Sequence, residues 1–95
     1  AGEDLLAPQK IIELLRVASR DRQQNHEARR ALDRLTPRER DVLEALAEGL
    51  DSEQIARKLH ISIETERTHV VNILTKLGVH SRVQALVLAA RHGAI

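Results

Sequence analysis

A series of helix-start signals, beginning at Thr36, constrains the fold more than any other feature of the sequence. Thr36, Pro37 and Glu39 form the first signal: a capping hydroxyl, a proline suited to the first helical position, and a glutamate that completes a capping box. Later helix starts are marked by Asp51, Ser62 and the capping box from Ser81 to Gln84. Helix ends are marked by Gly49, Gly78 and Gly93. Residues 35–95 are therefore predicted to form four short helices joined by tight turns.

The pattern between these signals predicts an all-α fold. Apolar residues recur at helical spacing, and no segment shows the alternation of a half-buried strand. A further helix is predicted after Pro8, where the apolar positions are Ile11, Ile12, Leu14, Leu15 and Ala18. Residues 19–34 are polar and are expected to be a solvated linker, with a helix that pairs two chains as the alternative. The chain thus divides into an N-terminal helix and polar linker (1–34) and a helical module (35–95).

Composition excludes several classes of function. With 15 Lys and Arg against 14 Asp and Glu, a single chain lacks the charge for strong non-specific binding to a polyanion. The absence of Phe, Trp and Tyr excludes an aromatic base-stacking surface. The absence of cysteine excludes disulfides and thiolate metal sites and suits a reducing cytoplasm. No apolar run is long enough to span a membrane, and no signal-peptide pattern opens the sequence.

Enzymatic chemistry finds no support in the sequence. The five histidines include no pair at the i, i+4 spacing of a helical metal site, and no glycine-rich phosphate loop is present. We therefore predict no enzyme activity, no metal, no cofactor and no small-molecule substrate.

The second and third helices of the module are separated only by His60 and Ile61, which predicts a helix-turn-helix. Ala56 is small where the two helices approach each other. His60 stands where a left-handed residue is common, and Ile61 can pack toward the core. An αα-hairpin without a nucleic-acid role is the alternative.

The third helix separates into two faces at about 100° per residue. The inner face carries Glu66, Val70, Ile73, Leu74 and Leu77. On the outer face, Arg67 is suited to guanine and Val71 to the methyl group of thymine, although an isolated exposed valine is also common. Three side chains are suited to contact phosphates: Thr65 near the helix start, Lys76 at its far end, and His69. For His69, local packing is the alternative.

The fourth helix is apolar around most of its circumference. Val83, Leu86 and Ala90 share one face, and Val87 and Leu88 extend it. Such a helix needs a second covering surface, and a copy of itself across a two-fold axis is the simplest. The predicted dimer face consists of Val83, Gln84, Val87, Leu88 and Arg91. Cover by the segment from Ile11 to Ala18 is the alternative.

Two long stretches resemble the LuxR/FixJ-type DNA-binding domain of bacterial transcription regulators. They are LTPRERDVLEALAEGLDSEQIARKLHIS and TERTHVVNILTKLGVHSRVQALVLAARHG. The resemblance implies a cytoplasmic bacterial protein whose third helix, from about Ser62 to Leu77, lies in the major groove of double-stranded DNA. It places Arg67, Thr68 and Val71 at bases, and it places four residues near phosphates: Thr65, His69, Asn72 and Lys76. It also implies a homodimer through the fourth helix.

The opening AGEDLLAP resembles the end of a receiver domain and the linker after it, as in NarL/FixJ-type response regulators. The expected function is therefore sequence-specific transcription regulation on an inverted repeat, as the effector domain of a two-component response regulator. RNA polymerase is a further expected partner. The alternatives are a sigma region-4-like promoter module and a bundle that only dimerises.

Two residues depart from the family pattern. Glu66 stands where an apolar residue is usual, and we expect it at the edge of the core, paired with Arg57 or Arg38. Val71 stands where a basic or polar residue is common, which affects base preference rather than DNA binding itself.

Overall fold

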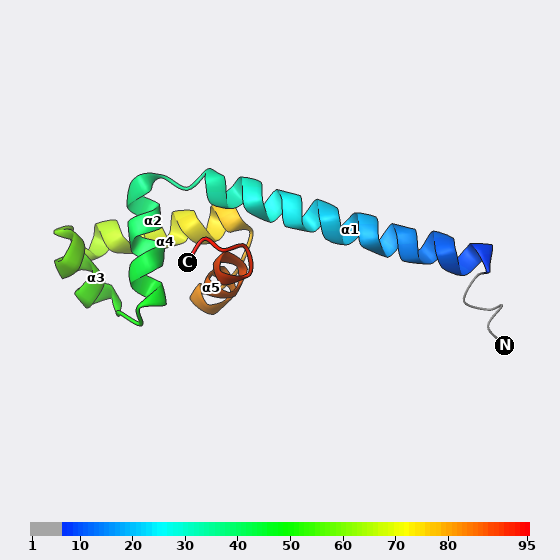
Figure 1. The fold of residues 1–95 in the computed structure, drawn as a ribbon. Helices are drawn as coiled ribbons and strands as arrows, with labels where there is room; N and C mark the ends of the chain where they lie inside the picture. Colours follow the sequence, from blue (N-terminus) through cyan, green and yellow to red (C-terminus); the bar gives the residue numbers. More distant parts are fainter. Residues whose placement is uncertain (1–6) are drawn as a thin grey trace.

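The computed structural model describes residues 7–95, which form five α-helices and no strand (Figure 1). The predicted all-α fold is confirmed. The resemblance assigned to the opening residues falls mostly on residues 1–6, which lie outside the described part of the chain. The helices are α1 (Pro8–Asp33), α2 (Pro37–Ala47), α3 (Ser52–Leu59), α4 (Ile63–Leu77) and α5 (Arg82–Arg91).

One continuous helix, α1, covers both the predicted N-terminal helix and most of the predicted linker. It projects away from the cluster formed by the other four helices, and only its C-terminal end joins them (Figure 1). Ala31 and Leu32 at that end are buried, as is Leu35 in the following loop. The polar segment therefore ends in two core residues, and these anchor α1 to the module.

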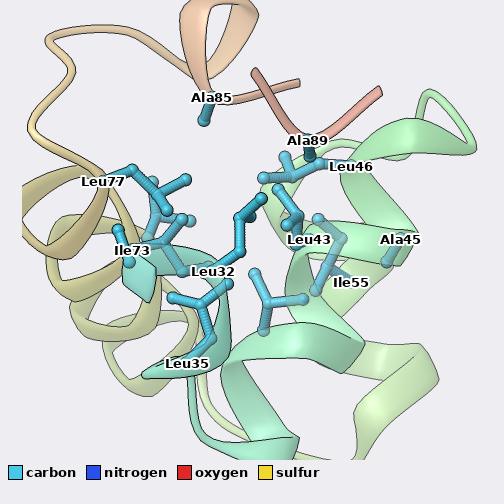
Figure 2. Packing of buried hydrophobic residues seen from close by; sticks show 13 residues of the cluster. Leu32, Leu35, Leu43, Ala45, Leu46, Ile55, Ile73, Leu77, Ala85 and Ala89 are labelled. Carbon is cyan, nitrogen blue, oxygen red and sulfur yellow. The ribbon is translucent and has the colours of Figure 1, made fainter. Parts of the chain in front are cut away.

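The core is aliphatic and lies where α4 crosses α2 and α3 (Figure 2). Buried leucine, isoleucine and valine side chains interlock there, and α5 closes one side through two alanines, Ala85 and Ala89. Because alanine is small, the α5 backbone can approach the core closely. The central members of the cluster are Leu32, Leu35, Val42, Leu43, Leu46, Ile55, Val70, Ile73, Leu77, Ala85 and Ala89.

The predicted caps of α2, α3 and α4 are confirmed. Thr36 and Glu39 exchange hydrogen bonds of 2.9 and 3.1 Å, and Asp51 and Gln54 exchange bonds of 2.9 and 2.8 Å. Ser62 accepts from the amide of Thr65 and so caps α4. The capping side chains accept from backbone amides of the first turn and so fix where each helix begins. The fixed starts set the directions of α3 and α4.

The predicted capping box at Ser81 is only half formed. The Ser81 hydroxyl accepts from the Gln84 amide at 3.1 Å, as expected. The Gln84 side chain, however, accepts from the amide of His80 at 2.8 Å instead of that of Ser81. Ser81 itself has extended backbone angles (φ −146°, ψ 157°).

The side of α5 that closes the core consists of two alanines that the apolar pattern did not single out. Ala85 and Ala89 are buried, whereas Val83 and Ala90 are exposed. The alternative in which the segment from Ile11 to Ala18 covers α5 is wrong, because these residues are exposed on the projecting part of α1. Of the helices in the described range 7–95, none is both long and apolar enough to cross a membrane.

Candidate nucleic-acid interface

The turn between α3 and α4 has the expected helix-turn-helix geometry. His60 adopts the left-handed conformation, with φ 57° and ψ 45°, as its position in the turn predicted. The amide of Ile61 then donates to the carbonyl of Ala56 at 3.0 Å, which closes the turn. Ala56 is buried between the two helices, and Ile61 is half-buried. The turn therefore holds α4 at a fixed angle to α3.

The outer face of α4 presents the three predicted base contacts together. Arg67, Thr68 and Val71 are all exposed, and Val71 is 60% exposed. The Thr68 hydroxyl donates to the carbonyl of Glu64 at 3.0 Å, so it offers an acceptor oxygen and a methyl group to the outside. This face combines a cation, a hydroxyl oxygen and apolar surface on a rigid helix.

The start of α4 carries a hydrogen-bonded pair of hydroxyls, Ser62 and Thr65. Ser62 Oγ accepts from the Thr65 amide at 3.0 Å and donates to Thr65 Oγ1 at 2.9 Å. Because Thr65 Oγ1 acts as acceptor in this pair, its own hydrogen remains available to a phosphate oxygen. Asn72 is exposed one turn after Thr68, whereas His69 is half-buried.

Lys76 was expected at a phosphate, but the structure directs it inward. Its ammonium lies 2.6 Å from Oε1 of Glu39 and 3.4 Å from the carbonyl oxygen of Arg34. The Glu39 side chain is only 4% exposed. Burial by itself raises the pKa of Glu39, but the hydrogen bonds from Lys76 and from the Thr36 amide outweigh it and hold that pKa below its ordinary value.

The prediction for Glu66 is wrong. Its side chain is fully buried, and neither carboxyl oxygen has a hydrogen-bond partner among residues 7–95. Arg38, one of the two expected partners, instead binds the carbonyl of Leu59 and the carboxylate of Asp41. Glu66 lies on the same face of α4 as Val70 and Ile73, and this face packs against α2 and α3. The helix therefore carries its side chain into the core, away from the surface cations.

The predicted dimer face of α5 borders a groove that the sequence did not reveal. Val83 is 69% exposed and Val87 is 49% exposed. The groove has a volume of about 360 Å³ and lies between α5 and the C-terminal half of α1. Its lining residues are Gln24, Asn25, Ala28, Val83, Gln84, Val87, Leu88, Arg91 and His92. All five residues of the predicted dimer face thus line this one groove.

Metal binding finds no site in the part of the chain that the structure describes, because no three His, Asp or Glu side chains there are grouped to hold an ion. The arrangement is suited to binding a partner: α4 is a rigid helix with a polar outer face and two hydroxyls at its start.

Comparison with known proteins places these features in a family. Residues 33–89 match the luxR family of bacterial regulatory proteins. The response regulator protein VraR of Staphylococcus aureus is 35% identical over 96 residues, which cover 99% of this chain and 42% of VraR. The nitrate/nitrite response regulator protein homolog of Haemophilus influenzae is 56% identical over 57 residues, covering 60% of this chain and 27% of that protein.

A solved structure has a similar fold. Full-length FixJ from B. japonicum superimposes with a TM-score of 0.68 at 29% sequence identity. The likeness covers 100% of this chain and 47% of the FixJ chain. The chain therefore spans less than half the length of each of these three proteins.

Proposed function

The chain belongs to the luxR family of bacterial regulatory proteins, and from this we propose that α4 reads double-stranded DNA in the major groove. The family, and relatives named as transcriptional and response regulators, support a role in DNA-binding transcription regulation. The observation that carries the proposal is the outer face of α4. Arg67, Thr68 and Val71 are exposed together there, while the opposite face is locked into the core.

Each of these three side chains has a base edge that suits it. The guanidinium of Arg67 can donate two hydrogen bonds to O6 and N7 of guanine. Val71 offers an apolar contact to the methyl group of thymine, and the Thr68 oxygen can accept from an exocyclic amine. We therefore assign sequence preference to Arg67, Thr68 and Val71.

Phosphate contacts are assigned to Thr65, His69 and Asn72, which flank that face. The hydroxyl of Thr65 stands at the start of α4, where the helix dipole favours an anion. Lys76 is assigned a different role from the one first expected, because its ammonium already has two acceptors within the chain. Its ion pair with Glu39 fixes the angle of α4 instead.

A dimer compensates for the low charge of the chain. The net charge is only +1, and Glu64 lies exposed on the outer face of α4, where it repels phosphate. Two copies joined through α5 would place two α4 helices in successive major grooves, about 34 Å apart, on an inverted repeat. We propose this homodimer from the exposed apolar residues of α5.

The relatives support a role within a larger regulator. VraR and the nitrate/nitrite protein are both named as response regulators, and each is longer than this chain. We propose that the chain is the effector domain of a response regulator of a two-component system. Contact with RNA polymerase stays a prediction.

The test is selection of binding sites from random duplex, followed by titration of the selected site at several salt concentrations. A sequence-specific dimer yields an inverted repeat, and its affinity falls as salt rises because phosphate counterions are released. Selection that yields no consensus, together with an affinity that is independent of salt, would overturn the proposal.

A further inference from the structure

The α5 face is small for a protein dimer. A stable interface buries about 800 Å² on each partner. The large apolar side chains that α5 exposes are Val83 and Val87, at 69% and 49%. Even an aromatic side chain buries only about 150–250 Å², so two valines and their polar neighbours cover a minor part of that area. A dimer through α5 needs additional surface.

Additional apolar surface lies on the projecting part of α1. Five large apolar residues are exposed there, between 42% and 67%: Ile11, Ile12, Leu14, Leu15 and Val17. These residues are spread around more than half of the helix circumference, and exposed apolar surface of this extent marks an interaction site. Within the described residues, the hydrophobic core does not include any of these five side chains.

Part of this apolar surface, formed by Leu14, Val17 and Ala18, lies on the side of α1 that leads into the groove at α5. Gln24, Asn25 and Ala28 are the α1 residues that line the groove. Val17 precedes Gln24 by seven residues, and Ala18 precedes Asn25 by the same interval. Leu14 precedes Asn25 by eleven residues. Intervals of seven and eleven return to the same face of a helix.

One partner can therefore cover both surfaces. The apolar side of α1 that carries Leu14, Val17 and Ala18 continues through Asn25 and Ala28 into the groove, where Val83 and Val87 of α5 begin. A second copy of the chain carries the same two surfaces in the same relation. A two-fold axis along this side would bring α5 against α5 and α1 against α1.

We propose that α1 forms the second half of the homodimer interface, with the side carrying Leu14, Val17 and Ala18 packed against α1 of a second copy. This inference rests on the proposed dimer and extends its interface beyond α5. The paired positions Ile11, Leu14, Ala18, Asp21, Asn25 and Ala28 alternate at intervals of three and four residues, as in a two-stranded coiled coil.

Two polar residues in this series set the character of the pairing. Asn25 occupies a position where a buried asparagine fixes the register of a coiled coil at some loss of stability. In this pairing, the two Asp21 side chains would face each other across the axis and repel. The pairing of α1 is consequently weak by itself and depends on simultaneous pairing of α5.

The chain contains no cysteine, so single introduced cysteines test this geometry directly. Ala18→Cys places a thiol on the side of α1 that is proposed to pair. Ser19→Cys places a thiol outside that side, facing away from the second copy. Under mild oxidation in the presence of the selected operator, Ala18→Cys should form a covalent dimer that reducing agent reverses, because a disulfide needs Cα atoms within about 7 Å. Ser19→Cys should remain mostly monomeric. Equal crosslinking of both variants would overturn the inference.

A second pair of variants measures the contribution to binding. Leu14 and Ile12 are both exposed, but Ile12 lies on the side of α1 away from the groove. Leu14→Gln should raise the dissociation constant of the dimer about tenfold, by loss of one buried leucine contact, and Ile12→Gln should leave it unchanged. Sedimentation velocity supplies this constant without DNA.

The outcome separates this inference from the proposed function. If Leu14→Gln dimerises and binds the operator as wild type does, the α1 interface is wrong while DNA recognition by α4 stands. If the wild-type chain shows no sequence preference for duplex, the proposed function is wrong, and the same crosslinking comparison without DNA still decides whether α1 pairs.

Discussion

The ammonium of Lys76 lies 2.6 Å from Oε1 of Glu39, which joins the last turn of α4 to the first turn of α2. The same carboxylate oxygen accepts from the amide of Thr36 at 2.9 Å, and Lys76 also reaches the carbonyl of Arg34. The ion pair therefore connects α4 with the loop that leads from α1 into α2. This ion pair therefore holds α4 in its orientation and stabilises the module.

Lys76→Met should destabilise the fold. Methionine keeps most of the apolar stem but leaves the buried Glu39 carboxylate without its cation, which costs about 1–3 kcal/mol. Urea denaturation measures the loss. The matched control is Lys58→Met, because Lys58 pairs with Glu48 at 2.7 Å with about half of each side chain exposed. Such a surface pair contributes at most about 1 kcal/mol. Equal losses in both variants would contradict a structural role for Lys76.

The stability contributed by Glu39 should depend on pH. Its pKa in the folded protein lies below its ordinary value, so the unfolded chain binds a proton more readily than the folded one. The contribution is therefore fully present above the ordinary glutamate pKa of about 4.3 and is lost as pH falls through the lowered folded pKa. Denaturation of wild type and Glu39→Gln between about pH 7 and about pH 3 should show a difference that shrinks on acidification. A constant difference would contradict this assignment.

Glu66→Leu should stabilise the protein. Glu66 is fully buried and neither oxygen has a hydrogen-bond partner within residues 7–95. Replacing it with an apolar side chain of similar size removes a burial cost of about 1–3 kcal/mol. Glu66→Gln is the control, because the amide keeps polar atoms without partners and should recover less. A melting temperature for Glu66→Leu below that of wild type would show that Glu66 is satisfied in solution.

Local signals were sufficient to predict most of the fold. Thr36, Asp51 and Ser62 cap helices where expected, and His60 adopts the predicted left-handed conformation, because these features depend on residues close in sequence. The exposed set of Arg67, Thr68 and Val71 followed from helical spacing in the same way.

Several differences from the sequence predictions involve contacts between distant residues. Lys76 finds Glu39, 37 residues away, although the spacing within α4 suggested a surface role. Glu66 was placed correctly on the inner face, but its lack of a partner depends on where Arg38 and Arg57 lie after folding. The groove between α1 and α5 depends on the angle of α1, which the sequence of a polar linker does not specify.

Val87→Asp should weaken operator binding without unfolding the monomer. Val87 is 49% exposed, so the carboxylate remains in water in a single chain but is buried opposite its symmetry mate in the proposed dimer. Circular dichroism should show wild-type helicity, and a gel shift should show reduced affinity for the full inverted repeat but not for one half-site. Ile95→Asp, which is 42% exposed and outside the predicted face, controls for the added charge. Unchanged affinity for the full repeat would remove α5 from the interface.

The most direct test of the central claim is the affinity of Arg67→Ala for the selected operator and for an unrelated duplex at the same salt concentration. Arg16→Ala, the same change at an exposed position of α1, controls for lost charge. If α4 reads bases, Arg67→Ala loses about 1–3 kcal/mol on the operator, relaxes the preference at one base pair and changes little on the unrelated duplex. An equal loss on both duplexes would contradict base recognition by Arg67 and with it the assigned role of the outer face of α4.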